Sequence, residues 1–297
     1  MKQIKYVIFL ALAVTSVFYS CKQDKKQNSE VIDYDKIGLN DPKKVISSND
    51  TIGEGLPIFY NMYLSVEMST LFESVNAVFN QDLLNKTDKV SEYLTSSKKA
   101  LNLGVYAVDL SYARIFEQLE IAGRFFNSMQ QLSEELGIPG EFFINSAKRF
   151  ERNINEKDSL IKIANEVYFA TDSYLKENEQ YSAAAQIILG GWIEAIYIAS
   201  NVAVGTKDIE IIERFADQKY SLKNLLEMLS GFEDDEIIKQ YISKLKALQS
   251  KFDLLIPDAI PDGDPDSPEV KKKVEQTLAQ IAPIKKSIAQ LRSETIE

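Results

Sequence analysis

Two acidic residues stand inside apolar helical patterns, and each is followed by a tyrosine three positions later. Asp109 and Tyr112 lie in GVYAVDLSYARI, and Glu194 and Tyr197 lie in GGWIEAIYIASN. Residues three apart are neighbours on one face of a helix. A carboxylate in apolar surroundings must be hydrogen-bonded, paired with a cation or protonated. These four residues are therefore the candidate ligand-binding site, and the elements around them must show how the acids are satisfied.

Three interpretations of the two acids stay open. The sequence favours an internal polar network that fixes the register of the helices. The second is a polar patch in the bundle core or in a cleft that holds a small ligand or a cation. The third is acid–base chemistry by paired carboxylates, as in glycoside hydrolysis. The side chains that could partner the acids are Tyr112, Tyr197, Arg114, Arg124 and Asn201.

The chain has no histidine, and Cys21 is its one cysteine. A Ser-His-Asp or Cys-His catalytic group is therefore impossible, as is any His-ligated zinc, haem or di-iron site. Oxygen ligation of Ca²⁺ or Mg²⁺ is what remains for a metal. The sequence also has no Gly-rich phosphate loop and no dinucleotide fingerprint. We therefore expect no cofactor, no bound metal and no enzymatic activity.

From residue 56 onward, glycine and proline fall between stretches with helical periodicity, and no stretch alternates as a strand would. We expect an all-α, multi-helix bundle of about eight or nine helices in a single domain, 56–297. The two acid–tyrosine pairs are 85 residues apart, which allows a duplicated helical unit. The first expected helix covers 57–79, and a short helix and then a long one with apolar positions from 108 to 136 follow it. Further helices are expected at 141–155, 157–178, 181–204, 208–230 and 233–255, and over a C-terminal segment.

Residues 182–205 are the most apolar stretch and could be read as a transmembrane span or as a buried central helix. Glu194 lies near the middle, where a carboxylate in a bilayer costs roughly 3 kcal/mol. No Lys or Arg closely flanks the start of the stretch. We therefore favour the central helix, in which Gly190 and Gly191 let a neighbouring helix approach closely.

Residues 256–268 are rich in Pro and Asp and predict a linker before the C-terminal helix. Their alternating acids resemble a calcium loop. Counted from Asp262, however, positions six and twelve are Ser267 and Lys273, where an EF-hand needs Gly and Glu. We expect a solvated linker with an acidic helix start at 267–269. Pro283 should kink the helix that follows.

The N-terminus has the pattern of an export signal. Lys2 and Lys5 precede an apolar run over 6–17, which is too short to span a bilayer. The run ends in FYSC, which resembles the lipobox of bacterial lipoproteins, and this resemblance implies a signal peptide over 1–20 and acylation of Cys21. The alternative is a non-lipidated signal or anchor with Cys21 incidental. A lone exported thiol, which acylation would consume, favours the lipoprotein.

Residues 21–55 are polar and without periodicity, as expected for a flexible tether. Lys22 stands where some Gram-negative lipoproteins carry the Asp that favours inner-membrane retention, and Asp24 is the one acid nearby. We expect the outer membrane, facing the periplasm. Removing 1–20 takes away two of the 34 basic residues and none of the 44 acids, so the net charge falls from −10 to −12. That charge argues against nucleic acid as a partner, and against attachment to anionic lipid by charge.

The FYSC box, together with LGVYAVDLSYA and GGWIEAIYIAS, resembles uncharacterised all-helical lipoproteins of Bacteroidetes. The resemblance implies a location and a fold, without a mechanism. We expect a lipid-anchored envelope lipoprotein that acts as a non-enzymatic binding or assembly module. Its expected partners are the membrane through Cys21 and an envelope protein or small ligand. The alternative is a receptor for a small ligand or cation at the Asp109, Tyr112, Glu194 and Tyr197 patch, and a carboxylate hydrolase is the third hypothesis.

Overall fold

The computed structural model describes residues 77–139, 149, 152, 174–175, 177–255, 264 and 266–297. Contacts divide the chain into units 1–40 and 41–297, and all described residues belong to the second. The predicted signal peptide, Cys21 and tether lie outside the described residues, as do most of 57–79 and of 141–178. Of the predicted linker, 256–263 and 265 also lie outside.

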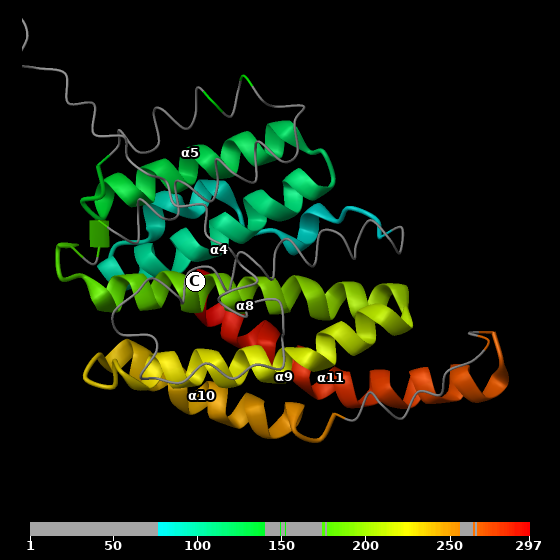
Figure 1. Cartoon of the computed structure of the whole chain (residues 1–297). Coiled ribbons are helices and arrows are strands. Elements are labelled where there is room, and N and C mark those ends of the chain that lie inside the picture. Colours follow the sequence, from blue (N-terminus) through cyan, green and yellow to red (C-terminus); the bar gives the residue numbers. More distant parts are fainter. Residues whose placement is uncertain are drawn as a thin grey trace, which may run out of the picture. The chain divides into compact units, whose positions relative to one another are not determined.

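Every regular element in the described part is a helix, and none of it is a strand, which confirms the all-α class (Figure 1). The elements are η2 (Gln81–Leu83), η3 (Thr87–Glu92), α4 (Ser96–Ile115), α5 (Leu119–Glu135), α8 (Tyr181–Thr206), α9 (Ile209–Ser230), α10 (Glu236–Phe252) and α11 (Pro268–Ile296).

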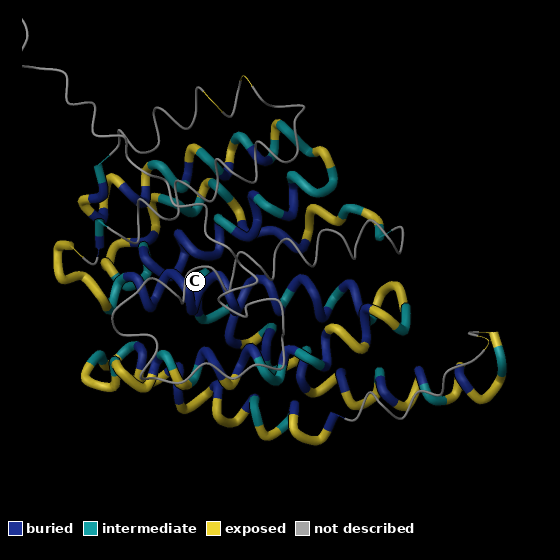
Figure 2. The backbone as a smooth tube through the Cα atoms, in the orientation of Figure 1, coloured by how far each residue is buried: buried dark blue, intermediate teal, exposed yellow. Residues whose placement is uncertain are grey.

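Helices α4 and α8 form the centre of the bundle. They pack on each other, α5 packs on α4, α9 packs on α8, and α10 packs on α9. Helix α11 contacts α8, α10 and α4. Figure 2 shows α4 and α8 almost continuously buried, whereas α10 and α11 alternate between buried and exposed positions. The most apolar helices thus lie inside, and the amphipathic ones bury one face each.

Helix α8 is the one described helix that is long and apolar enough to cross a membrane. Within its most apolar window, 83% of the residues are buried inside the bundle. Trp192 is 1% exposed, and its indole N–H donates to the Ser221 hydroxyl of α9 at 2.7 Å. These contacts fit the central-helix interpretation of 182–205.

Two glycines bring the α4 and α8 backbones into direct contact. A Cβ atom on Gly104 would lie 1.9 Å from the carbonyl oxygen of Ile187, and a Cβ atom on Gly190 would lie 1.9 Å from that of Leu101. No side chain can occupy that space, so the two helices can cross this closely only with glycine at both positions. This contact fixes where along each helix the remaining side chains meet.

The long helix expected up to residue 136 is wrong, because the chain turns between α4 and α5. Glu117 has a φ of 58°, in the left-handed region that favours glycine. The Glu117 and Gln118 amides donate to the carbonyls of Arg114 and Ala113 at 2.9 and 2.8 Å. This bonding pattern is a Schellman motif built without glycine. The apolar periodicity continues on both sides of the turn, so the pattern gave no signal for it.

The N-termini of the later helices lie where capping residues in the sequence predict them. Asp208, Asp235 and Ser267 cap the N-termini of α9, α10 and α11 with side-chain oxygens. Helix α11 continues through Pro283, whose carbonyl accepts a hydrogen bond from the Ser287 hydroxyl at 3.1 Å. Ser267 confirms the helix start expected at 267–269.

The glycine contact predicts a large cost for two small substitutions. Gly104→Ala and Gly190→Ala should each lower the free energy of unfolding by about 1–3 kcal/mol or more, because the added methyl group overlaps a backbone carbonyl. Gly123→Ala in α5 is the matched control, since its Cβ would meet nothing within 4 Å and alanine favours a helix. Urea unfolding of the three variants measures the difference. Near-native stability of Gly104→Ala would contradict the close backbone contact.

Candidate functional site

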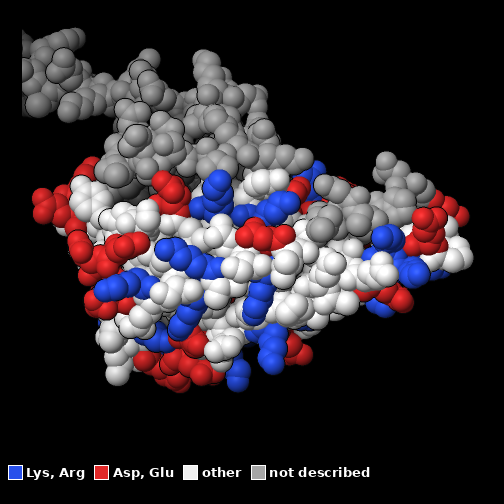
Figure 3. Space-filling model, turned by 90° about the horizontal axis from the view of Figure 1, so that it is seen from below, with Lys and Arg blue, Asp and Glu red and all other residues white. Residues whose placement is uncertain are grey.

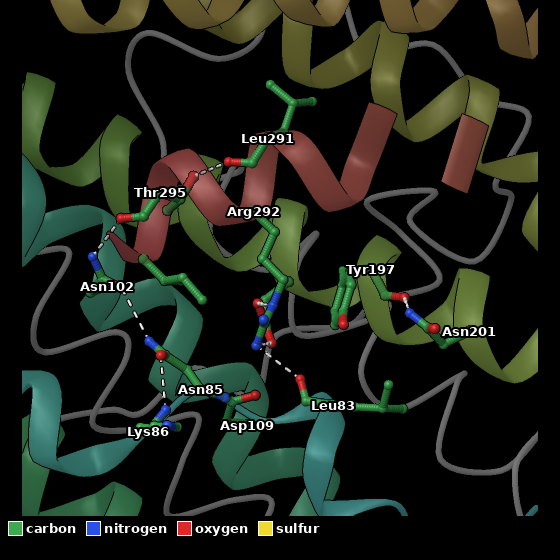
Figure 4. Close-up of polar contacts among 12 residues, drawn as sticks. Leu83, Asn85, Lys86, Asn102, Asp109, Tyr197, Asn201, Leu291, Arg292 and Thr295 are labelled. Atoms are coloured by element: carbon green, nitrogen blue, oxygen red, sulfur yellow. Dashed lines mark hydrogen bonds and ion pairs between the residues drawn. The ribbon is translucent and has the colours of Figure 1, made fainter. Parts of the chain in front are cut away.

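Asp109 of α4 and Glu194 of α8 are both fully buried, each with 0% of its surface exposed. The α4–α8 crossing brings their carboxyl groups together, so that the charge of Glu194 acts directly on Asp109. The sequence offered five candidate partners for these acids, but the cation is Arg292 of α11. In Figure 4, Arg292 reaches from α11 toward Leu83 and passes beside Tyr197.

Arg292 binds Glu194 through two parallel hydrogen bonds. Its Nε donates to Oε2 at 2.7 Å, and its Nη2 donates to Oε1 at 2.8 Å. This bidentate geometry matches the planar fork of the guanidinium and is the strong form of a carboxylate ion pair. Burial opposes the charge on Arg292, but the Glu194 carboxylate outweighs it and raises the pKa of the guanidinium. The ion pair therefore connects the C-terminal helix to the central helix.

Two further contacts complete the surroundings of Arg292. Nη2 also donates to the carbonyl of Leu83 at 2.8 Å, and the guanidinium carbon lies 4.2 Å from the centre of the Tyr197 ring. A ring face attracts a cation, most strongly when water is excluded. Arg292 is 8% exposed. Its charge is thus balanced by Glu194, by a backbone carbonyl and by an aromatic ring.

Asp109 has a different environment. Its Oδ2 accepts the backbone N–H of Asn85 at 3.0 Å, whereas Oδ1 meets no donor among the described residues when the group is ionised. Burial is the main cause that raises the pKa of Asp109 well above its usual value, and the charge of Glu194 adds to it. A proton on Asp109 supplies the donor that is missing, with Glu194 as its acceptor. The pair is then one neutral acid beside one carboxylate.

The end of α11 is held by donors from the first part of the domain. Lys98 Nζ donates to the carbonyl of Glu294 at 2.6 Å, and Asn102 Nδ2 donates to that of Thr295 at 3.0 Å. Lys89 Nζ and the Tyr93 hydroxyl both donate to the carbonyl of Ile296, at 3.2 and 3.3 Å. These bonds satisfy carbonyls that a helix C-terminus leaves without partners. Together with Arg292, they fix the last turn of α11.

The structure brings together only part of the four-residue candidate site. Asp109 and Glu194 meet, and Tyr197 joins through its ring. Tyr112 contacts other residues: its hydroxyl accepts the N–H of Asn80 at 3.1 Å, and its ring centre lies 4.9 Å from that of Phe116. Of the two tyrosines that follow an acid by three residues, Tyr197 is the one whose ring contacts Arg292.

Sequence reasoning missed Arg292, although a signal was present. Ile281, Ile284 and Ile288 form the buried stripe of α11, and Arg292 falls four residues after the last of them. A charge on the apolar face of an amphipathic helix needs a buried partner of opposite charge. Glu194 was the natural candidate for that partner, because it is likewise a charged residue within an apolar helix.

The site can hold one proton, on Asp109, and one cation, which the chain itself supplies as the guanidinium of Arg292. Arg292 occupies the position that a bound cation would take at the Glu194 carboxylate. Among the described residues, no group of three or more Asp, Glu, His or Cys could hold a metal ion. Comparisons with family models, curated proteins and solved structures found no match for the chain.

The buried ion pair predicts a strong effect of removing its cation. Arg292→Met should lower the free energy of unfolding by about 3–5 kcal/mol, because Glu194 stays buried without its counter-charge. Lys244→Met is the control, since Lys244 pairs with Glu294 between α10 and α11 at an exposed position, where about 0–1 kcal/mol is expected. Urea unfolding measures both. Equal costs for the two variants would contradict the assigned role of Arg292.

Proposed function

We propose that the chain is a lipid-anchored lipoprotein of the bacterial envelope and that its helical domain is a non-enzymatic binding or assembly module. The lipobox-like FYSC and the Lys22 that follows it support acylation at Cys21 and the outer membrane, facing the periplasm. The observation that carries the non-enzymatic proposal is the closed network of Glu194 and Arg292. Their hydrogen bonds are directed to one another and to the chain's own backbone.

A catalytic carboxylate must be reached by a substrate, and neither acid can be reached here. Asp109 and Glu194 are 0% exposed, and the Arg292 guanidinium lies on the acceptor oxygens of Glu194. Hydrolysis by paired carboxylates also needs room for a water or a sugar between them. The geometry therefore favours the internal polar network over the hydrolase.

The molecular surface agrees with a general envelope module. On the face shown in Figure 3, Lys and Arg lie interspersed with Asp and Glu, and neither sign covers the face. A nucleic-acid partner would call for a continuous basic surface. A protein partner, or a ligand bound elsewhere on the domain, fits a mixed surface of this kind.

The receptor for a small ligand or cation is the second candidate. One observation favours it: Oδ1 of Asp109 is buried and without a donor when ionised. A small cation or a donor group from a ligand could satisfy this oxygen. A proton does so with no ligand and no change in the packing, which is why the receptor ranks second.

We also infer that the domain contains a duplicated unit, in which α4–α5 corresponds to α8–α9. The glycine contact is reciprocal: Gly104 meets Ile187, Gly190 meets Leu101, and both pairs of equivalent residues are 86 positions apart. In Figure 1, the turns that end α4 and α8 lie on the same side of the bundle. Asp109 and Glu194 are 85 positions apart, so their offset differs by one residue from the 86-residue offset of the glycines.

The second helices support the duplication. Glu117 and Lys207, 90 positions apart, both have left-handed φ angles, of 58° and 56°, just before α5 and α9. The same offset aligns identical residues in the two helices, namely Glu120 with Glu210, Ile121 with Ile211, Arg124 with Arg214, Phe125 with Phe215 and Leu132 with Leu222. The inference predicts that relatives of this chain share both offsets, of 86 and 90 residues, except where a surface loop carries an insertion.

Acylation is tested on the full chain made in a bacterium that processes lipoproteins. We expect the mature N-terminal peptide to begin at Cys21 and to carry the mass of its acyl chains, because the sequence before it resembles a lipobox. Mass spectrometry of that peptide gives the answer. Cys21→Ser should abolish the added mass and release the protein from the membrane fraction, whereas Lys22→Gln should retain both. An unmodified Cys21 in the mature protein would refute the anchor.

The two candidate functions are separated by native mass spectrometry of the acylated protein extracted from its envelope. We expect no small molecule or metal ion that depends on Glu194, because Arg292 already occupies that carboxylate. A bound small mass that is lost in Glu194→Gln but retained in Lys244→Gln would instead establish the receptor. Ligand-dependent thermal stabilisation, which grows with ligand concentration over Kd, would confirm it.

A further inference from the structure

Two short segments contact the buried acids, and we call them the cover: residues 83–86, and residues 291–297 at the end of α11. The first contributes the Asn85 N–H that donates to Asp109. The second contributes Arg292, which binds Glu194 and the carbonyl of Leu83. The guanidinium thus joins the two segments to each other and to the acids. Leu83, Asn85 and Arg292 are 8%, 5% and 8% exposed, whereas Asp109 and Glu194 are 0% exposed, so the cover keeps a slight contact with solvent that the acids lack.

The charges beneath the cover balance only while one of the two acids is protonated. Glu194 and Arg292 cancel each other, which leaves Asp109 to be neutral or uncompensated. Among the described residues, no second cation reaches either carboxylate, since Lys89 and Lys98 donate to the carbonyls of α11. The titratable and charged groups that face the acids from the surrounding elements are Tyr93, Tyr106, Tyr197 and Arg292.

None of the tyrosines can compensate a second negative charge. Burial raises the pKa of Tyr93 and of Tyr106, so both stay neutral at ordinary pH. Once Asp109 ionises, two buried carboxylates face one guanidinium. The cost of an uncompensated buried charge is high, and hydration of the carboxylate is the available relief.

The cover is the part that can move to admit water. Helices α4 and α8 pack through direct backbone contact at Gly104 and Gly190 and are buried along most of their length, so moving either of them would disturb the centre of the bundle. The 83–86 segment follows the three-residue helix η2 and lies before η3, so no long helical ladder holds it. Its bonds to the rest of the site include that of the Asn85 N–H to Asp109 and that of the Leu83 carbonyl with Arg292.

We propose that residues 83–86 and 291–297 form a proton-controlled cover, which stays shut while Asp109 carries a proton and opens when that proton is lost. The shut form binds one proton more than the open form, in which Asp109 is hydrated and has an ordinary acidity. Shutting is therefore favoured at low pH and lost as the pH rises through the raised pKa of Asp109.

Amide hydrogen exchange of the full chain over a range of pH tests the proposal. The reporters are the Asn85 amide, which donates to Asp109, and the amides of 291–296, with rates corrected by an unstructured peptide of the same sequence. Between the ordinary pKa of a hydrated aspartate and the raised pKa of Asp109 in the shut form, the opening constant should rise about tenfold per pH unit, because each opening then releases one proton. Above the raised pKa the opening constant should level off. The Leu245 amide of α10 should stay better protected than the reporters at every pH.

Matched variants separate the proton of Asp109 from other causes. In Asp109→Asn, which keeps the shape of a neutral acid, the opening constant should be independent of pH. Lys244→Gln removes an exposed ion pair to Glu294 of α11 and should keep the tenfold rise. The proposal is overturned by a wild-type opening constant that does not change with pH. A rise that persists in Asp109→Asn, or reporters that open only together with Leu245, would equally overturn it.

A second measurement holds even where Asp109→Asn does not fold. Infrared spectroscopy of the wild-type protein detects the band of a protonated buried carboxyl group. We expect this band at neutral pH, and its loss should follow the same pH range as the opening of the cover. A spectrum with no such band from mildly acidic to neutral pH would refute the protonated Asp109 and with it the proposal.

Discussion

The contact between the α4 and α8 backbones is the constraint on which the rest of the domain depends. Because Gly104 and Gly190 each lie on a carbonyl of the other helix, neither helix can slide or rotate without a collision. This fixed crossing places Asp109 beside Glu194, where two carboxyl groups would otherwise avoid each other. The polar network is therefore a consequence of the packing. Helix α11 supplies Arg292 and the 83–86 segment supplies the Asn85 N–H, and both provide partners for the buried acids.

The two adjacent acids are satisfied in different ways, although the glycine contacts at the helix crossing are reciprocal. Glu194 receives a guanidinium with two hydrogen bonds, and Asp109 receives a single backbone N–H and keeps its proton. A buried ion pair contributes little net stability when compared with apolar packing, because both charges lose their hydration. Its value here is positional, since Arg292 can satisfy Glu194 only when α11 is docked in one register.

Much of this could be predicted from the sequence. The all-α class, the central position of 182–205 and the helix start at Ser267 follow from periodicity, hydropathy and capping residues. That Asp109 and Glu194 need partners also follows from their apolar surroundings. The turn at Glu117 could not be found, because a Schellman motif with Glu in the left-handed position leaves no Gly or Pro signal. The pairing with Arg292 spans 98 residues, so it depends on how three helices assemble.

Arg292 follows Glu194 by 98 positions, which has a consequence for the order of synthesis. A ribosome makes α4 and α8, which carry the two acids, before it makes the cation that pairs with Glu194. The polar centre of the nascent domain therefore stays incomplete until α11 has been synthesised. A truncation within α11 that removes Arg292 would leave Glu194 buried without its counter-charge.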